Sequence, residues 1–263
     1  MECVKYLNSF DEIVSLVSEV QFRRILRPGV MEHYRGQGRP EYKLLPNLAR
    51  GADNAVDVSS KEDRLIQLFK NELIKNGMEQ ALRIDEHLGK KENLWNILIQ
   101  MQHYSIPTRL LDWSLKWEVG LWFAVENSEN DEVDGQFWIF TVPDEIHSTS
   151  TRDNYYNKDI DNLDKTYFIN APIYWSDELS GQVAEIKRQR QHGKFSISPF
   201  NSSFVPLEDQ PEISPYLEKY CIPARLKGQL RLELTSKGFH EEWLYYREKN
   251  SPKLEELIGK ILS

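Results

Sequence analysis

Three short segments of the chain combine arginine and amide side chains with histidine or glycine, and these residue types can bind an anion and move protons. The segments are residues 33–37 (HYRGQ), 102–113 (QHYSIPTRLLDW) and 187–195 (KRQRQHGKF). A guanidinium group presents a fork of N–H donors that fits phosphate oxygens. Together the segments predict one pocket for a small phosphate-bearing ligand.

In the first segment, Arg35 lies where a predicted strand runs into Gly36, with Tyr34 and Gln37 on either side. We expect Arg35 to bind phosphate and Gly36 to let the ligand approach the backbone, because glycine has no side chain in the way. Tyr34 and Gln37 are predicted to contact the same ligand. The structural alternative is that Arg35 pairs with a carboxylate of the core and Gly36 forms a turn.

The second segment holds candidate catalytic groups. Arg109 and Asp112 lie three residues apart beside leucines, and charged side chains in such surroundings are seldom buried unless they are paired or bind a ligand. Because an unperturbed histidine side chain titrates near neutral pH, His103 is the first candidate for a general acid or base. We expect Gln102 to contact a ribose or a base edge and Thr108 to line the same pocket. For Asp112 a structural alternative stays open, because its carboxylate could cap the next helix.

The third segment supplies local positive charge. Arg188 is predicted to hold phosphate together with Arg35, since charge-assisted hydrogen bonds are strong. Gln191 precedes a glycine at the mouth of a strand, and we expect its amide to contact a ribose. One alternative is a solvated basic turn. The other is that Arg35, Arg109 and Arg188 all pair with acids inside the core.

The elements that would position these residues are helices first and strands later. Apolar spacing predicts helices at residues 9–24, from about residue 61, at 92–104, at 117–126, at 225–237 and from residue 251. Residues rich in β-branched and aromatic side chains predict strands at 32–36, 108–114, 136–142, 167–175, 193–199 and 219–223. Ser9 with Glu12 and Ser59 with Glu62 have capping-box spacing, and Gly238 stands where a helix would end. We predict an α+β fold, in which a helical N-terminal region packs on a mixed, mainly antiparallel sheet.

Composition narrows the function classes. The chain has 263 residues, a net charge of −8 and 40% hydrophobic residues, so it can form a core, and broad nucleic-acid binding, which depends on Lys and Arg, is not expected. No apolar run reaches the roughly 18–20 residues that span a bilayer, and no secretory signal pattern is visible. Two cysteines cannot build a disulfide framework. The six histidines show no paired helical spacing, so no metal site is predicted. We expect a reduced, cytoplasmic protein with no membrane partner.

As a set, the motifs resemble the Phe-Arg-Gly (FRG) domain family. The matching text is HYRGQ, with Tyr in the place of Phe, then KLLPNLAR, QHYSIPTRLLDWSLKWEVGLWFAVE, RQRQHGKF and KYCIPARLKGQLRLELTSKGF, and it extends over residues 9–245. We expect one domain over residues 1–263, with an N-terminal helix at 9–24, a core at 28–245 and a C-terminal helix at 251–263 that packs back on the core. The occurrence of this family in bacteria and phages implies a phage-defence or toxin context.

A second resemblance is to ADP-ribosyltransferases. That superfamily often has YRG on a first strand, as at residues 34–36, then a strand leading into a helix, as in LLDWS…LWFAV. It also has a catalytic Glu near the start of a third strand, where this chain has Gln191. A glutamine can hydrogen-bond a ribose hydroxyl but brings no negative charge. Glu185, six residues earlier, is the carboxylate that could replace it.

This resemblance implies NAD as substrate or ligand, and transfer of its ADP-ribose, with a protein as a candidate target, or cleavage of its glycosidic bond as the reaction. His103, Gln191 and Asp112 would then be the catalytic residues. A non-catalytic nucleotide-binding or interaction module would use the same residues without turnover. In the third alternative the arginines are purely structural.

Overall fold

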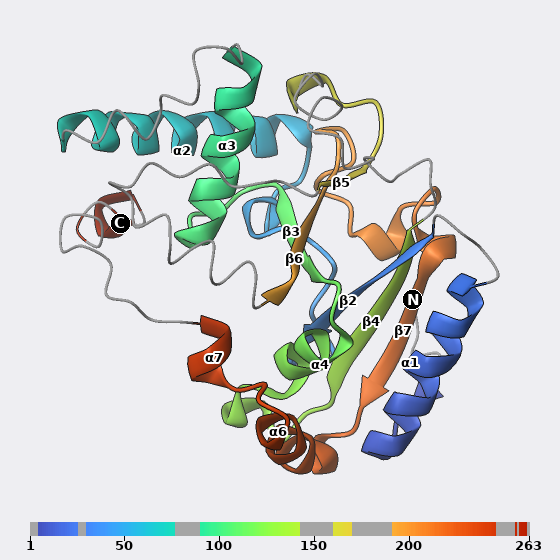
Figure 1. Cartoon of the computed structure of the whole chain (residues 1–263). Helices are drawn as coiled ribbons and strands as arrows, with labels where there is room; N and C mark the ends of the chain where they lie inside the picture. The colour runs from blue at the N-terminus through green and yellow to red at the C-terminus, as the bar shows by residue number, and fades with distance from the viewer. Residues whose placement is uncertain are drawn as a thin grey trace.

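The computed structural model describes residues 5–25, 30–76, 90–142, 160–169, 191–245, 256 and 258–261. Seven strands form one sheet in the order β1-β7-β4-β2-β3-β6-β5 (Figure 1). The strands are β1 (Lys5–Tyr6), β2 (Met31–Gln37), β3 (Leu110–Ser114), β4 (Gly135–Val142), β5 (Tyr167–Ile169), β6 (Gly193–Ile197) and β7 (Leu217–Ile222). β1 pairs with β7 in parallel, and every other pair is antiparallel. The predicted mixed, mainly antiparallel sheet is confirmed.

Helices cover two parts of this sheet. They are α1 (Phe10–Ile25), α2 (Ala55–Lys75), α3 (Lys90–His103), α4 (Trp117–Val125), α6 (Lys227–Ser236) and α7 (Glu241–Tyr245). One hydrophobic cluster joins α1, α4, α6 and α7 to β2, β4 and β7, and another joins α2 and α3 to β3 and β6 (Figure 1). The chain therefore has the predicted α+β fold, with α1 on one part of the sheet and α2 and α3 on the other.

The first helix begins where its capping residues predict. The backbone N–H of Glu12 donates to Ser9 Oγ at 3.1 Å, which is one half of the expected capping box. The Glu12 carboxylate accepts from the backbone N–H of Asn8 at 2.7 Å. α1 then extends over Phe10–Ile25, close to the predicted range.

The second helix begins six residues earlier than predicted. The Asn54 side chain accepts from the backbone N–H groups of Val56 and Asp57, so Asn54 caps α2 and the helix begins at Ala55. The polar composition of residues 51–60 predicted a loop. Asparagine is among the best N-cap residues, however, and its capping bonds stabilise a helix that already begins within this stretch. Glu62, predicted as a cap partner, instead lies buried within the helix.

The C-terminal elements are confirmed in part. Gly238 has a φ of +89°, the left-handed conformation typical of the residue after a helix C-cap, and Lys237 is the C-cap of α6. Ile258 and Ile261 pack in the cluster of α2 and α3, as expected of a C-terminal helix that folds back. Residues 251–255 lie outside the described residues, and the predicted strand 167–175 is described only as β5. β1 and α7 were not predicted, since two and five residues are too few to show a period.

Cys221 in β7 is disulfide-bonded, which corrects the expectation of reduced cysteines. Two cysteines form no framework, but they suffice for one bond. None of the described helices combines the length and the apolar character that crossing a bilayer requires. The cytoplasmic location stays a prediction.

The sheet opens between β2 and β3. All seven residues of β2 pair with β4, whereas β2 and β3 share the single pair Tyr34–Ser114. β3 forms five pairs with β6 at its other edge. Beyond Tyr34 and Ser114 the two central strands diverge, so the side chains and backbone of both can face a common space.

Helix α4 crosses β2 at very short range. A Cβ atom at Gly36 would lie 2.0 Å from the carbonyl oxygen of Gly120 and 2.3 Å from the backbone nitrogen of Ala124. A Cβ at Gly120 would in turn lie 2.8 Å from the Cβ of Tyr34. This close approach of α4 requires a glycine at position 36. Gly36 also lines the cavity described below, so its contact with a ligand stays a prediction.

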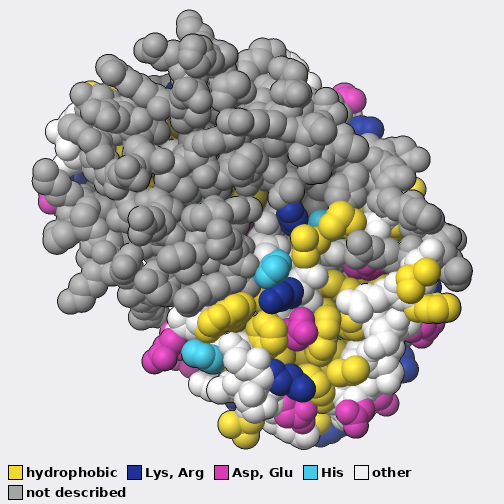
Figure 2. All heavy atoms as spheres, in the orientation of Figure 1, with side chains coloured by type: hydrophobic (Ala, Val, Ile, Leu, Met, Phe, Trp, Pro, Cys, Tyr) yellow, Lys and Arg dark blue, Asp and Glu magenta, His cyan; other side chains and the backbone are white. Residues whose placement is uncertain are grey.

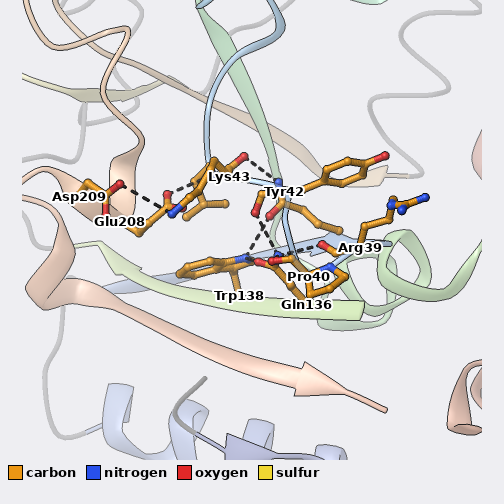
Figure 3. A network of polar contacts seen from close by, with 10 residues as sticks. Arg39, Pro40, Tyr42, Lys43, Gln136, Trp138, Glu208 and Asp209 are labelled. Atoms are coloured by element: carbon orange, nitrogen blue, oxygen red, sulfur yellow. Dashed lines mark hydrogen bonds and ion pairs between the residues drawn. The ribbon is translucent and has the colours of Figure 1, made fainter. Parts of the chain in front are cut away.

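The loop after β2 is held on the sheet by Gln136 of β4 (Figure 3). Its Nε2 lies 2.8, 2.6 and 3.0 Å from the carbonyl oxygens of Arg39, Pro40 and Tyr42. Its Oε1 accepts from the indole N–H of Trp138 at 2.9 Å. One buried amide thus fixes the turn that carries Tyr42.

The same loop is fixed again further along (Figure 3). Gln37 Nε2 donates to the carbonyl of Lys43 at 2.9 Å, and the backbone N–H of Leu44 donates to Glu208 Oε2 at 3.1 Å. Lys43 Nζ lies 3.9 Å from a carboxylate oxygen of Glu208 and of Asp209. These bonds fix the chain at Lys43 and Leu44, and so define where the segment that leads to the 3-10 turn η1 (Asn47–Ala49) begins.

Candidate functional site

A cavity of about 520 Å³ lies where β2 and β3 diverge, and this volume suits a small-molecule site. Its polar lining is Arg35, Gln37, Arg50, Gln102, His103, Ser105, Asp112, Ser114, Glu126, Asn127, Asn130 and Gln191, together with Tyr34, Tyr42 and Tyr245. Figure 2 shows basic, acidic and histidine side chains close together among apolar ones on the face where α4 and β6 lie. Most of the predicted site residues thus share one space.

Arg35 spans the gap between the diverging strands. Its Nη1 donates to the carbonyl oxygen of Asp112 at 2.5 Å, in place of a backbone ladder bond between β2 and β3. Its Nε is buried without a hydrogen-bond partner among the described residues, and burial lowers the pKa of the guanidinium. An unpaired buried donor is costly, so Arg35 has unused capacity to bind an anionic ligand.

A directional chain of hydrogen bonds orients Gln102 and Asp112. The backbone N–H of Leu110 donates to Thr108 Oγ1 at 3.1 Å, and Thr108 Oγ1 donates to Gln102 Oε1 at 2.6 Å. This fixes the amide of Gln102 so that its Nε2 donates to Asp112 Oδ2 at 2.6 Å. Thr108 is fully buried and does not line the cavity, so it positions Gln102 instead of contacting a ligand.

The Asp112 carboxyl lines the cavity, and protein atoms surround it on its other sides. Burial raises the pKa of its carboxyl, while the charge of Arg35 and the hydrogen bond from Gln102 act to lower the same pKa. The balance makes Asp112 a group that could accept or donate a proton. It does not cap the next helix, because Lys116 is the N-cap of α4 and no side chain bonds there.

A second arginine of the cavity, Arg50, was missed by the sequence analysis. It is exposed, follows the 3-10 turn η1 (Asn47–Ala49) and lines the same cavity as Arg35. The positive charge of Arg50 acts to lower the pKa of Arg35, although burial is the main cause of that shift. No acidic side chain among the described residues forms an ion pair with Arg50. Its signal in the sequence was the KLLPNLAR motif, whose last residue it is.

The sequence analysis also missed Glu126, a second carboxylate of the cavity. It follows the last residue of α4 and is half-buried. Tyr245 Oη of α7 donates to Glu126 Oε2 at 2.6 Å. Burial raises the pKa of Glu126, the side chains of Tyr245 and Trp122 act to lower it, and the negative charge of Glu241 adds to the increase.

Glu126→Gln is expected to stabilise the protein in a pH-dependent way. The raised pKa means that ionised Glu126 destabilises the folded state, and a carboxylate at a helix C-terminus opposes the helix dipole by about 0.3–1 kcal/mol. The stability that the protonated Glu126 carboxyl contributes is fully present below its pKa in the unfolded chain and is lost as pH rises through its pKa in the folded protein. The difference in unfolding free energy between variant and wild type should be small near pH 4 and grow toward pH 8. Urea unfolding at both pH values measures it, and a pH-independent difference would contradict it.

His103 and Gln191 both line the cavity, as predicted. The His103 ring contacts Phe195 edge-on, with 6.3 Å between centroids and an interplanar angle of 87°. Gln191 is tethered at both ends: its carbonyl accepts from Ser114 Oγ at 2.6 Å, and its Nε2 donates to the carbonyl of Leu244 at 3.2 Å. Its amide oxygen is the part that could contact a ligand.

Tyr34 and Gln37 line the cavity but are partly engaged with the protein. The Tyr34 ring is buried and stacks on Phe137, with 6.0 Å between centroids. The Gln37 amide bonds to Lys43, as described above, and its Oε1 accepts from the indole N–H of Trp138 at 3.2 Å. Of the first segment, Arg35 has the most capacity left for a ligand.

Arg109 lies outside the cavity and is fully buried. Its Nε donates to Glu62 Oε2 at 2.8 Å, and its Nη1 and Nη2 donate to the carbonyls of Ser198 and Ile160. The guanidinium also lies 3.5 Å from the centroid of the Phe200 ring. Arg109 therefore has a structural role in place of the predicted ligand contact. It joins α2, through Glu62, to the segments that contain Ser198 and Ile160.

Two predicted residues cannot be placed, because Arg188 and Glu185 lie outside the described residues. In the described ranges, no three His, Cys, Asp or Glu side chains are grouped as ligands of a metal ion.

No curated protein and no solved structure matches the chain significantly. The family model of the FRG domain matches residues 32–133, a range that includes Arg35, Arg50, Gln102, Asp112 and Glu126. This match is shorter than the resemblance over residues 9–245, and the outer domain boundaries stay a prediction. The chain therefore contains an FRG domain. Most of the cavity lining lies within the matched range, so this domain provides the greater part of the site.

Proposed function

We propose that the cavity binds a small phosphate-bearing nucleotide of the NAD type. The observation that carries this proposal is that Arg35 and Arg50 line one cavity, where Arg35 has a buried donor without a partner and Arg50 has no acidic partner among the described residues. A phosphate group bound between two guanidinium groups accepts charge-assisted hydrogen bonds from both and offsets their mutual repulsion.

The remaining lining suits the sugar and base of such a ligand. Gln102, Gln191 and Asp112 present amide and carboxylate groups that can bind hydroxyls or a base edge. Asp112 lies beside Arg35, so it partly offsets the positive charge there and favours a ligand that has hydroxyl groups near its phosphate. A bare anion would gain less from this site.

For the chemistry, we propose glycosidic cleavage of NAD or transfer of its ADP-ribose, on an ADP-ribosyltransferase-like core, in a phage-defence or toxin context. Asp112 supports this proposal, because it is a carboxylate at the cavity that could stabilise positive charge developing on the ribose. His103 would serve as general acid or base. The second candidate function is a non-catalytic nucleotide-binding module. It is favoured by Gln191, which has no charge and whose amide is tied to Leu244.

Arg50→Ala is expected to weaken the binding of NAD and ADP-ribose about ten- to a hundredfold, the loss of one or two charge-assisted hydrogen bonds. Because Arg50 is exposed and unpaired among the described residues, its removal should leave the melting temperature unchanged. Titration calorimetry measures the affinities. The matched control is Arg64→Ala, which removes an exposed arginine of α2 that does not line the cavity and should change neither quantity.

A nicotinamide-release assay on the wild type then separates the two functions. Saturable NAD binding together with nicotinamide release indicates the enzyme, and binding without release leaves the module. If NAD, ADP-ribose and ATP all fail to bind, the proposed nucleotide site is wrong.

A further inference from the structure

We infer that Glu126 binds a sugar hydroxyl of the ligand at a part of the cavity away from the two arginines, and that Tyr245 is its positioning residue. The inference rests on the proposed function, since it assigns a role at the same site. It also supplies a carboxylate that the sequence analysis sought at Gln191 and Glu185.

The first support is the position of Glu126 in the cavity. It directly follows α4 and shares the cavity lining with Asn127 and Asn130 on the turn that comes next. Arg35 comes from β2 and Arg50 follows η1, and among the described residues neither forms an ion pair with Glu126. The lining therefore presents its arginines and this carboxyl from different elements, which we call the arginine part and the carboxyl part of the cavity.

The second support is the way Glu126 is held. Tyr245 Oη donates to Oε2 at 2.6 Å, and the Tyr245 ring packs edge-on against Phe123 of α4, with 6.2 Å between centroids. A carboxylate can accept about four hydrogen bonds, so the bond from Tyr245 orients Glu126 without exhausting it. No cation among the described residues forms an ion pair with Glu126.

The third support is the chemistry of the neighbouring groups. A carboxylate accepts from hydroxyl groups, and the amide nitrogens of Asn127 and Asn130 can donate to them, while their side-chain oxygens accept from Glu129 and Arg39. Arg39 and Lys227 bond to Asn130 but do not line the cavity, so Glu126 is the charged side chain that this part of the lining presents. Its carboxylate repels a phosphate placed beside it, which favours the arginine part for the phosphate of the ligand. A sugar joined to a phosphate satisfies both parts at once, which is the arrangement in ADP-ribose.

The test compares two probes, ADP-ribose and inorganic pyrophosphate, by titration calorimetry. Glu126→Ala is expected to weaken ADP-ribose about tenfold, because a hydrogen bond to a charged acceptor is lost, and to leave pyrophosphate unchanged or bound more tightly. Arg50→Ala should weaken both probes. Glu129→Ala is the matched control, since Glu129 is an exposed acid three residues further on that does not line the cavity.

Tyr245→Phe tests the positioning role. It keeps the ring that packs on Phe123 and removes only the hydroxyl, so it should weaken ADP-ribose about three- to fivefold and leave pyrophosphate affinity and the melting temperature nearly unchanged. If Glu126→Ala affects both probes equally, or neither, the inference is wrong while the phosphate site stands. If the wild type binds neither probe, the proposed function fails as well.

Discussion

Gly36→Ala is expected to lower the unfolding free energy by about 3 kcal/mol or more, although it adds a single methyl group. The new Cβ would lie 2.0 Å from one backbone atom of α4 and 2.3 Å from another. Backbone atoms cannot rotate away as a long side chain can, so α4 as a whole must shift off β2. For a domain of this size the melting temperature should fall by about 6–12 °C.

The matched control is Gly228→Ala in α6. A Cβ there meets only Arg231 Nη2, at 3.9 Å, and alanine is the better helix residue by about 0.5–1 kcal/mol. This variant should therefore be slightly stabilised, and thermal unfolding followed by circular dichroism compares the two. If Gly36→Ala kept its stability and lost ADP-ribose affinity, the contact with the ligand, and not the contact with α4, would be the reason for a glycine at this position.

Gly36 illustrates what a sequence pattern predicts and what it does not. The apolar residues of 117–126 predicted a buried helix, and α4 is that helix. The pattern cannot tell which strand the helix crosses or how closely, because that depends on contacts between segments about 80 residues apart. Two glycines facing each other across such a contact look, in the sequence, like two unrelated glycines.

The site itself was predictable where its residues lie in dense polar motifs. Arg35, Gln102 and Asp112 come from two such motifs, and the structure brings them to one cavity. Arg50 ends a mainly apolar motif and Glu126 ends an apolar helix, so neither lies in a dense polar segment and both were missed. For Glu126 a signal existed, since an acid at the C-terminal end of an almost wholly apolar helix opposes the helix dipole.

The assignment of Arg109 failed for a different physical reason. Arg109 was assigned to the same ligand as Asp112, but side chains three residues apart in extended chain point to opposite faces. Its actual partner, Glu62, is 47 residues away on α2. The start of α2 had itself been placed too late, so Glu62 was assigned to a helix cap and was not available as a core acid.

Arg109→Met is the variant for which we expect the second large effect. Removing the guanidinium leaves Glu62 buried without its counter-charge, and breaking a buried pair in this way costs about 3–5 kcal/mol, or about 6–20 °C in melting temperature. The carbonyls of Ser198 and Ile160 lose their donors at the same time. Urea unfolding and thermal unfolding both measure the loss.

The pH dependence of that loss identifies its cause. Burial raises the pKa of Glu62, and Arg109 counteracts this, so the variant should have a still higher Glu62 pKa. A carboxyl with a raised folded pKa contributes full stability below its unfolded pKa and loses it as pH rises through the folded value. The penalty of Arg109→Met should therefore be smaller at about pH 5 than at about pH 8, and Glu62→Gln added to Arg109→Met should remove this dependence. A penalty independent of pH would mean that the lost carbonyl bonds and the contact with Phe200, and not the unpaired carboxylate, destabilise the variant.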